Sequence, residues 1–299
     1  MKILLSTLII ILLYLFLIKP NTSRKDKMKP YEQTLICHRG FFNNIDIPEN
    51  SIKAFKKAVD HNYGIELDVQ ITTDNKLVVF HDESLKRMTG IDKNLRECDY
   101  KELQKYNLLD TNEKIPLFSE VLKTIKKDTP LIIEIKPEGR CIENVKGVVE
   151  MMKEYDGLYN IESFNPKVVK YLKDNEPQII RGQLSESYFK YKEYNLFIKI
   201  VLTYLLSNVV TRPDYIAYDH NDANNISFRL ISKLFKGECV AWTIKSPEQL
   251  NKAKKMAFWY VQKHGRAGLK LTLLNQSTHL LLVPHHLVKH HALLCHPFN

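Results

Sequence analysis

The sequence predicts a (β/α)8 barrel that follows an apolar N-terminal helix. From residue 31 onward, short apolar runs alternate with longer amphipathic stretches, which is typical of βαβ units around a parallel sheet. About seven or eight such units in about 250 residues fit a barrel of this kind. No GxGxxG loop follows the first strand candidate, as a doubly wound dinucleotide-binding sheet would usually have. We find no internal sequence repeat.

The strand candidates are short runs rich in β-branched or aromatic residues and bounded by turn residues or charge. They are Thr34–Cys37, Ile65–Val69, Leu77–Phe80, Leu131–Ile135, Tyr159–Ser163, Ile179–Leu184, Tyr215–Tyr218 and Val240–Ile244. Apolar residues at helical spacing predict helices between several of them, within Ser51–His61, Ser119–Lys127 and Pro166–Asn175. The expected barrel domain covers residues 33–255.

The N-terminal segment contains an uncharged apolar run, Ile3–Ile18. As a helix it would span about 24 Å, a little less than a hydrocarbon core of ~30 Å. No small-x-small cleavage site follows it. We expect residues 1–19 to form an uncleaved transmembrane helix that anchors the protein in the cell membrane. A cleaved signal peptide and a buried core helix are the alternatives.

Residues 20–32 are polar and basic, and we expect them to form a tether that could touch anionic headgroups. Basic residues after the apolar run favour a cytoplasmic catalytic domain by the positive-inside rule. A signal peptide would instead place the domain outside, so the side of the membrane stays open.

Composition limits the classes of partner. The formal net charge of +10, from 44 basic and 34 acidic residues, suits phosphate, anionic lipid or nucleic acid. The charge is concentrated in the tether and the C-terminal tail without interleaved aromatic residues, which argues against a nucleic-acid partner. The five cysteines are odd in number, widely spaced and without a CxxC pair, which argues against a disulfide framework and a structural zinc site.

Charged and titratable side chains gather at the carboxyl ends of four strand candidates, where barrel enzymes build their active sites. Glu66 and Asp68 lie on one face of their strand, because side chains alternate with period two. The full set comprises His38 and Arg39, Glu66 and Asp68, His81, and Glu134 and Lys136. Singly, such residues are more often structural than functional, so the argument rests on their conjunction.

The conjunction describes phosphodiester cleavage. Two adjacent carboxylates repel each other unless a cation lies between them, and hard oxygen ligands suit Mg²⁺ or Ca²⁺. Two histidines can serve as general acid and general base near neutral pH. A divalent cation together with Arg39 and Lys136 can neutralise a phosphate.

Residues 33–250 resemble the glycerophosphodiester phosphodiesterase family. The resemblance is carried by ordered motifs: LICHRG (Leu35–Gly40), PENS (Pro48–Ser51), AFKKAV (Ala54–Val59), GIELDVQITTD (Gly64–Asp74), LVVFHDESLKRMTG (Leu77–Gly90), KIPLFSEVL (Lys114–Leu122) and LIIEIK (Leu131–Lys136). ESFNP (Glu162–Pro166) and VAWTI (Val240–Ile244) are similar to later strand ends of the family. The family's insertion would cover about residues 92–112.

The resemblance implies a TIM-type barrel and assigns roles by motif position. Glu66, Asp68 and Glu134 would hold the cation. His38 and His81 would act as base and acid, while Arg39 and Lys136 would bind the phosphate. Glu49 would support the metal site, and Phe164 and Trp242 would form apolar walls for the glycerol or lipid part, or else simply pack in the core. The implied reaction hydrolyses glycerophosphodiesters to glycerol 3-phosphate and an alcohol.

The C-terminal end departs from the family pattern. No Asp or Glu follows Glu248, and seven of the eleven histidines lie at or after His264. The nearest run to an eighth strand, Met256–Val261, lacks the Asp and the nearby Pro with which the family's last strand ends. We therefore expect an atypical segment over residues 256–299 and a doubtful eighth strand, which would leave the barrel open at an unpaired edge.

Two other functions stay open at this point. One is a phospholipase D that acts on lysophospholipids or sphingomyelin with the same barrel and the same histidines. The other is a non-catalytic, membrane-bound remnant whose barrel end has decayed.

Overall fold

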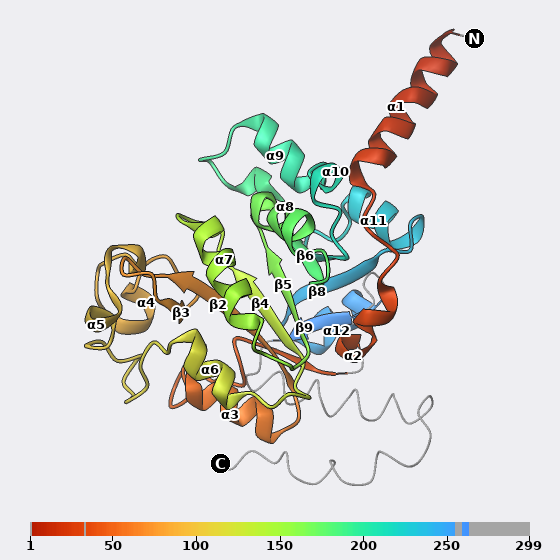
Figure 1. Cartoon of the computed structure of the whole chain (residues 1–299). Coiled ribbons are helices and arrows are strands. Elements are labelled where there is room, and N and C mark those ends of the chain that lie inside the picture. Colours follow the sequence, from red (N-terminus) through yellow and green to blue (C-terminus); the bar gives the residue numbers. More distant parts are fainter. Residues whose placement is uncertain (1, 33, 255–258, 263–299) are drawn as a thin grey trace, which may run out of the picture.

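Eight parallel strands close into a barrel in the computed structural model, which describes residues 2–32, 34–254 and 259–262 (Figure 1). Each strand pairs with the next, and the last pairs with the first, in the order β1 (Ile36–His38), β2 (Gly64–Ile71), β4 (Leu131–Ile135), β5 (Tyr159–Ser163), β6 (Arg181–Ser185), β7 (Tyr215–Asp219), β8 (Glu238–Ile244) and β9 (Trp259–Gln262). The predicted barrel of parallel strands is confirmed, and all eight predicted strands lie within two residues of their expected ends, seven of them in the barrel.

The expected doubt about the eighth strand is wrong. β9 comes from the apolar run Met256–Val261, pairs with β8 through Val240 opposite Trp259, and pairs with β1 through Ile36 opposite Val261. Closure needs backbone pairing on both sides, which an apolar run supplies without the family's terminal Asp and Pro. β9 also lies beyond residue 255, where the barrel was expected to end. The rest of the expected C-terminal segment lies outside the described residues.

The third predicted strand has a different position from the one expected. β3 (Leu77–Val79) runs antiparallel to β2, with Val79 opposite Val69, and is not a barrel strand. β2 extends beyond the residues that pair with its parallel neighbours. β3 pairs with this extension and runs in the opposite direction, so it brings the chain back toward the carboxyl edge of the barrel. There the backbone N–H of Phe80 donates to the carbonyl of Asp68 at 3.0 Å. This return places His81 beside the strand that carries two of the acidic residues.

Helices cover the outside of the barrel (Figure 1). The Ser51 hydroxyl accepts from the backbone N–H of Ala54 and caps the first of them, and Asn165 caps α8, whose first residue is Pro166. These helices are α3 (Ile52–Asp60), α6 (Phe118–Thr124), α7 (Cys141–Met152), α8 (Pro166–Asn175), α11 (Ile226–Lys233) and α12 (Pro247–Lys254). The three predicted helices are thus confirmed to within three residues at each end.

The segment that contains the expected insertion, about residues 92–112, lies between β3 and α6. Between β3 and α6 the chain forms α4 (Lys86–Thr89), the 3-10 turn η2 (Leu95–Glu97) and α5 (Tyr100–Leu103). Their apolar side chains form a small core of their own around Leu85, Met88, Leu95 and Ile115. A second excursion, between β6 and β7, contains η3 (Tyr188–Lys190), α9 (Leu196–Thr203) and α10 (Asn208–Thr211).

The N-terminal helix α1 (Lys2–Ile18) projects from the body of the protein (Figure 1). Its last residue, Ile18, is buried in the cluster that contains Ile216 and Phe228, whereas most of its other side chains are exposed. Among the described residues, no helix is both long and apolar enough to cross a membrane, so the expected transmembrane span is not supported.

The basic segment expected to form a tether, residues 20–32, packs against the barrel. The turn η1 (Lys25–Met28) and the short helix α2 (Lys29–Glu32) bury Met28 and Tyr31 against the barrel, in a cluster with Ile36, Ile132 and Tyr215. Arg24 forms an ion pair with the buried carboxylate of Asp214. Burial of Met28 and Tyr31, together with this ion pair, therefore holds the basic stretch against the barrel.

Candidate active site

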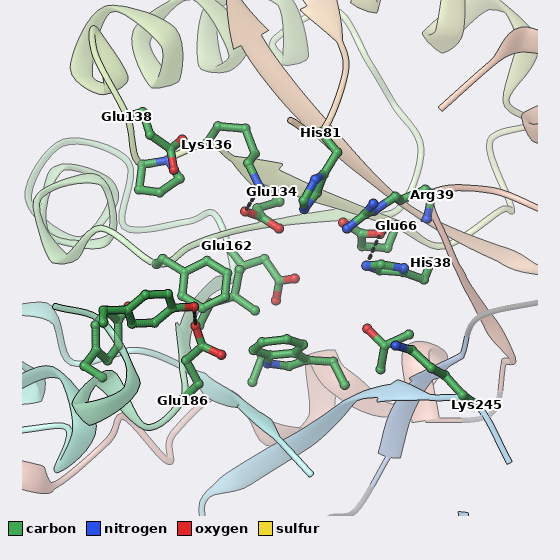
Figure 2. Close-up of a pocket in the computed structure, with 18 of the residues that line it drawn as sticks. His38, Arg39, Glu66, His81, Glu134, Lys136, Glu138, Glu162, Glu186 and Lys245 are labelled. Carbon is green, nitrogen blue, oxygen red and sulfur yellow. Dashed lines mark hydrogen bonds and ion pairs between the residues drawn. The ribbon is translucent and has the colours of Figure 1, made fainter. Parts of the chain in front are cut away.

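A cavity of about 550 Å³ opens among the strand ends and gathers most of the predicted site residues (Figure 2). Its lining includes both histidines, both phosphate-binding candidates, two of the acids and both aromatic wall candidates: His38, His81, Arg39, Lys136, Glu66, Glu134, Phe164 and Trp242. Asp68 and Glu49 do not line it. Each of these two carboxylates lies instead behind the lining and contacts Arg39.

Three buried carboxylates converge because of strand register. Glu66 and Asp68 share a face of β2, and β4 pairs so that Glu134 is opposite Asp68. One oxygen from each of the three lies within 4.8 Å of the others. Burial, and then the charges of Asp68 and Glu134, raise the pKa of Glu66 well above its usual value. Burial would also raise the pKa of Asp68, but the surrounding cationic groups, led by His81 and Lys136, lower it.

The residues present fit a divalent cation. The Lys136 ammonium lies 2.9 Å from Glu134 Oε1 and 3.4 Å from Asp68 Oδ1, and Arg39 Nε lies 3.5 Å from Asp68 Oδ2. Arg39 is shared with Glu49, at 2.6 Å, so the three carboxylates are not fully balanced by these two side chains. An all-oxygen donor set with excess negative charge is the kind of site that binds Mg²⁺ or Ca²⁺.

His38 is placed to accept a proton. It ends β1, and its Nε2 lies 3.9 Å from Glu66 Oε2. Its Nδ1 is buried and has no hydrogen-bond partner among the described residues. Burial, and then the charge of Arg39, lower the pKa of His38 well below its usual value. The imidazole is therefore neutral at physiological pH and free to act as a base.

His81 is held by its neighbour Asp82. His81 Nδ1 lies 2.6 Å from Asp82 Oδ1. Burial would raise the pKa of Asp82, but the hydrogen bonds from His81 and Arg87 outweigh it and lower the pKa. The contact with the ionised Asp82 fixes the orientation of the His81 ring toward the cavity that it lines.

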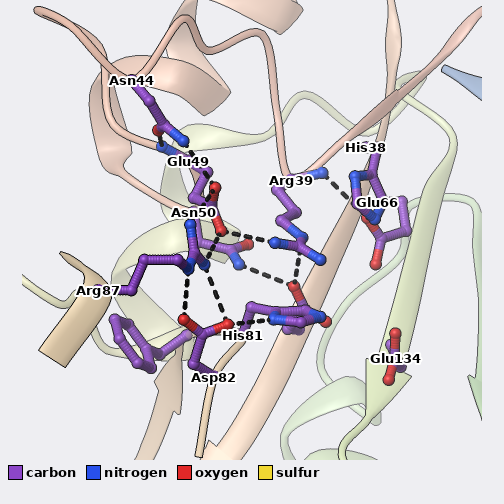
Figure 3. Close-up of polar contacts among 12 residues, drawn as sticks. His38, Arg39, Asn44, Glu49, Asn50, Glu66, His81, Asp82, Arg87 and Glu134 are labelled. Carbon is purple, nitrogen blue, oxygen red and sulfur yellow. Dashed lines mark hydrogen bonds and ion pairs between the residues drawn. The ribbon is translucent and has the colours of Figure 1, made fainter. Parts of the chain in front are cut away.

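A network of partly buried polar side chains surrounds His81 and Asp68, and the sequence analysis missed most of it (Figure 3). Arg87 Nε donates to Asp82 at 2.5 Å, and the Arg87 guanidinium also binds Glu49. Asn44 donates to Glu49 at 2.8 Å, and Asn50 donates to Asp68 at 2.8 Å. Asp82 was detectable from its place directly after His81 in the sequence, whereas nothing in the sequence around Arg87 points to its partner Glu49.

Glu162 is a further buried acid in the cavity lining that the sequence analysis did not nominate. Burial, and then the charge of Glu134, raise the pKa of Glu162 to about 8. The Tyr215 hydroxyl donates to Glu162 Oε2 at 2.8 Å. At neutral pH this carboxyl is mostly protonated, so it adds little charge to the site. Its position in ESFNP, at the end of β5, was the available signal.

Aromatic side chains form the other walls. The rings of Phe164 and Trp242 meet edge to face, with centroids 5.5 Å apart, as expected for a shared apolar wall. Tyr188, Tyr191 and Tyr194 also line the cavity. They come from the excursion between β6 and β7, which has no strand-end pattern to draw attention to it.

Comparisons with known proteins agree with this geometry. A family model described as the glycerophosphoryl diester phosphodiesterase family matches residues 38–258. A glycerophosphodiester phosphodiesterase of Caldanaerobacter subterraneus is 34% identical over 161 residues, which is 50% of this chain and 65% of the relative. In that relative and two others, the match spans 54–65% of their own length.

Solved structures share the fold. The crystal structure of a glycerophosphodiester phosphodiesterase from Thermotoga maritima is 26% identical, covers 77% of this chain and 94% of that chain, and has a TM-score of 0.59. A phosphodiesterase of Oleispira antarctica, solved with its product sn-glycerol-3-phosphate, is 21% identical, covers 78% of this chain and 94% of that chain, and has a TM-score of 0.62.

Proposed function

Because this chain belongs to the glycerophosphoryl diester phosphodiesterase family, we propose that it hydrolyses glycerophosphodiesters to glycerol 3-phosphate and an alcohol. The observation that carries the proposal is the convergence of two histidines, two cationic side chains and three buried carboxylates at one cavity. The histidines supply proton transfer, the cations bind an anionic diester, and the carboxylates suit a divalent ion.

Two histidines divide the proton transfers. His38, neutral because burial lowers its pKa, takes the proton from the attacking hydroxyl, which belongs either to water or to the substrate's own glycerol. As the bond between phosphorus and the leaving oxygen breaks, His81 gives its proton to that oxygen, and the alcohol departs neutral. Attack by water gives glycerol 3-phosphate directly. Attack by the glycerol hydroxyl gives a cyclic phosphate, which a water molecule then opens to glycerol 3-phosphate with the two histidines in reversed roles. Asp82 keeps His81 oriented throughout.

The diester's negative charge is met by Arg39 and Lys136, which both line the cavity. Glu66, Asp68 and Glu134 would hold Mg²⁺ or Ca²⁺ beside them. When bound, such an ion supplies further positive charge for the phosphoryl oxygens. The wall of Phe164 and Trp242 would pack against the glycerol or lipid part of the substrate.

A second candidate is a phospholipase D that acts on lysophospholipids. The observation in its favour is α9, which begins two residues after the cavity-lining Tyr194 and exposes Leu196 and Phe197. An acyl chain could lie along these side chains.

We also propose that the protein works at a lipid surface. The side chains of α1 from Ile3 to Leu13 are exposed on all sides of the helix and almost entirely apolar, which suits insertion among acyl chains. The net charge of +10 favours anionic headgroups. Flotation with phosphatidylglycerol vesicles tests this directly. The full chain should float and a chain lacking residues 3–13 should not, whereas equal flotation of both would contradict the proposal.

A substrate panel tests the reaction. The full chain with Mg²⁺ or Ca²⁺ should release glycerol 3-phosphate from glycerophosphocholine or glycerophosphoglycerol. Turnover of lysophosphatidylcholine alone would favour the phospholipase D. No turnover of any substrate by a protein that still melts cooperatively would contradict both enzymes and favour the non-catalytic barrel.

A further inference from the structure

Three tyrosines line the cavity near Glu186, to which the Tyr191 hydroxyl donates a hydrogen bond. The ring centroids of Tyr188 and Tyr191 are 5.7 Å apart, those of Tyr188 and Tyr194 are 5.6 Å apart, and those of Tyr191 and Tyr194 are 6.1 Å apart. All three rings line the cavity. We call these three residues the tyrosine wall. Their mutual contact fixes the rings and leaves π faces and edges for a ligand.

Acidic side chains surround the tyrosine wall. Glu138, Glu186 and Glu193 line the same cavity, and Figure 2 shows Glu138 and Glu186 across it from His38. Glu186 is paired with Lys190, but within the described part of the chain neither Glu138 nor Glu193 has an ion pair. Burial, and then these three carboxylates, raise the pKa of Tyr194, so all three act on one ring.

The tyrosine wall already accommodates an ammonium group. The Lys190 Nζ lies 5.5 Å from the centroid of the Tyr191 ring while it pairs with Glu186. Lys245, the cationic lining residue that is not beside the carboxylates of β2 and β4, lies on the opposite side of the cavity from Glu138 in Figure 2. Glu138 and Glu186 thus lie on the side of the tyrosines, whereas the cationic side chains of Arg39 and Lys245 lie across the cavity from them (Figure 2).

We propose that the tyrosine wall, with Glu138, Glu186 and Glu193, binds a cationic alcohol group of the substrate, namely a small ammonium such as choline. The inference rests on the proposed hydrolysis and names its preferred substrate class. Aromatic faces attract ammonium groups, above all quaternary ones that carry little hydration, and nearby carboxylates add to the attraction. A neutral alcohol group of the same shape receives neither contribution. The wall therefore selects among glycerophosphodiesters by the charge of the leaving alcohol.

Two substrates of the same shape, which differ only in the charge of the alcohol group, measure the contribution of that charge. Glycerophosphocholine is compared with the glycerophosphodiester of 3,3-dimethylbutanol, in which carbon replaces the quaternary nitrogen. We expect kcat/KM for the choline ester to exceed that for the neutral ester by about tenfold, in line with one partly desolvated cation–π contact. Addition of free choline should compete with the choline ester.

Variants of Tyr194 test the wall itself, because this ring is 37% exposed and its replacement should leave the fold intact. Tyr194→Leu should reduce the choline preference by about fivefold, while Tyr194→Phe, which keeps the π face, should retain it. Glu193→Gln should also reduce the preference. Phe189→Leu is the matched control, since Phe189 is an exposed aromatic residue of the same excursion that does not line the cavity.

The outcomes separate the two proposals. Equal kcat/KM for the two esters in the unmodified protein would overturn the tyrosine site and leave the hydrolase in place. So would an equal loss on both esters in Tyr194→Leu. If neither ester is cleaved, the proposed hydrolysis is wrong, and ligand-observed NMR of the full chain with choline and with 3,3-dimethylbutanol then tests the site. Signal transfer to choline alone supports the site, and its absence contradicts it.

Discussion

Arg87 donates hydrogen bonds to both carboxylate oxygens of Glu49, at 2.6 and 3.0 Å, although the two residues are 38 positions apart. Each of the two residues also binds a second side chain beside the cavity. Arg87 binds Asp82, the partner of His81, and Glu49 accepts from Arg39 at 2.6 Å. This one contact therefore connects the proposed acid to a phosphate-binding side chain, and couples the insertion to the barrel.

Loss of that connection should reduce turnover without unfolding the protein. Arg87→Gln removes the fork that fixes Asp82 and Glu49, so His81 loses its orientation, and we expect kcat to fall about tenfold or more. Steady-state kinetics and a thermal melt measure the two effects. Lys86→Gln is the control, because Lys86 is an exposed neighbour whose partner, Asp92, is also exposed. An unchanged kcat in Arg87→Gln would show that the network does not position His81.

The two histidines should each be essential to the chemistry. His38→Ala and His81→Ala should each lower kcat by at least the ~10² typical of a positioned acid or base. Initial rates at saturating glycerophosphodiester give the comparison, with His61→Ala as the control because His61 does not line the cavity. Near-normal turnover in either variant would remove that histidine from the mechanism.

The carboxylate cluster should determine the metal dependence. Glu66→Ala and Glu134→Ala each remove one of three oxygen ligands, so activity that depends on Mg²⁺ or Ca²⁺ should be abolished in both. Rates are measured with and without a chelator, and Glu150→Gln, an exposed carboxyl on α7, serves as the control. Hydrolysis by the unmodified protein that resists chelation would count against the metal site.

Glu49 should make stability depend on pH. Burial would raise the pKa of Glu49, but the hydrogen bonds from Arg87 and the charge of Arg39 outweigh it and lower the pKa to about 2. A folded-state pKa below the unfolded one stabilises the protein above the unfolded value of about 4.5, and this stabilisation is lost as pH falls toward 2. The displacement corresponds to about 3 kcal/mol in the free energy of unfolding.

Urea unfolding of Glu49→Gln and the unmodified protein, at pH 7 and near pH 3, measures this dependence. The free energies of unfolding of the two proteins should differ most at pH 7, and the difference should shrink at the lower pH. Asp92→Asn, an exposed carboxyl, should show no such trend. A difference that is the same at both values would indicate that ionisation of Glu49 does not stabilise the fold.

The sequence predicts the barrel well because its signal is local. Seven of the predicted strands lie in the barrel, and the strand-end residues meet because parallel strands bring their carboxyl ends to one edge. The direction of β3 is not local information, since a run such as Leu77–Phe80 reads the same whether its partner is parallel or antiparallel. β9 was doubted because the run Met256–Val261 lacks the Asp and the Pro of the family pattern. Its pairing with β1, which joins the two ends of the barrel, is not local information either.

The sequence predicts the site residues that are both chemically reactive and placed at the end of a strand. It misses the residues whose role depends on contacts between distant parts of the chain. Glu66, Asp68 and Glu134 are acidic and lie near strand ends, and the structure brings them together. Arg87 reads as an ordinary basic residue of a short helix until the fold brings Glu49 to it. The tyrosine wall lies in an excursion between β6 and β7, where aromatic residues alone do not distinguish packing from binding.

The central claim is that one divalent ion and one phosphate share this cavity. Crystals of the full chain grown with Mn²⁺ and glycerol 3-phosphate test it, since anomalous scattering locates the ion without ambiguity. The account predicts the ion bound by oxygens of Glu66, Asp68 and Glu134, with the phosphate between His38 and His81. An ion at any other position, or a phosphate bound away from both imidazoles, would contradict it.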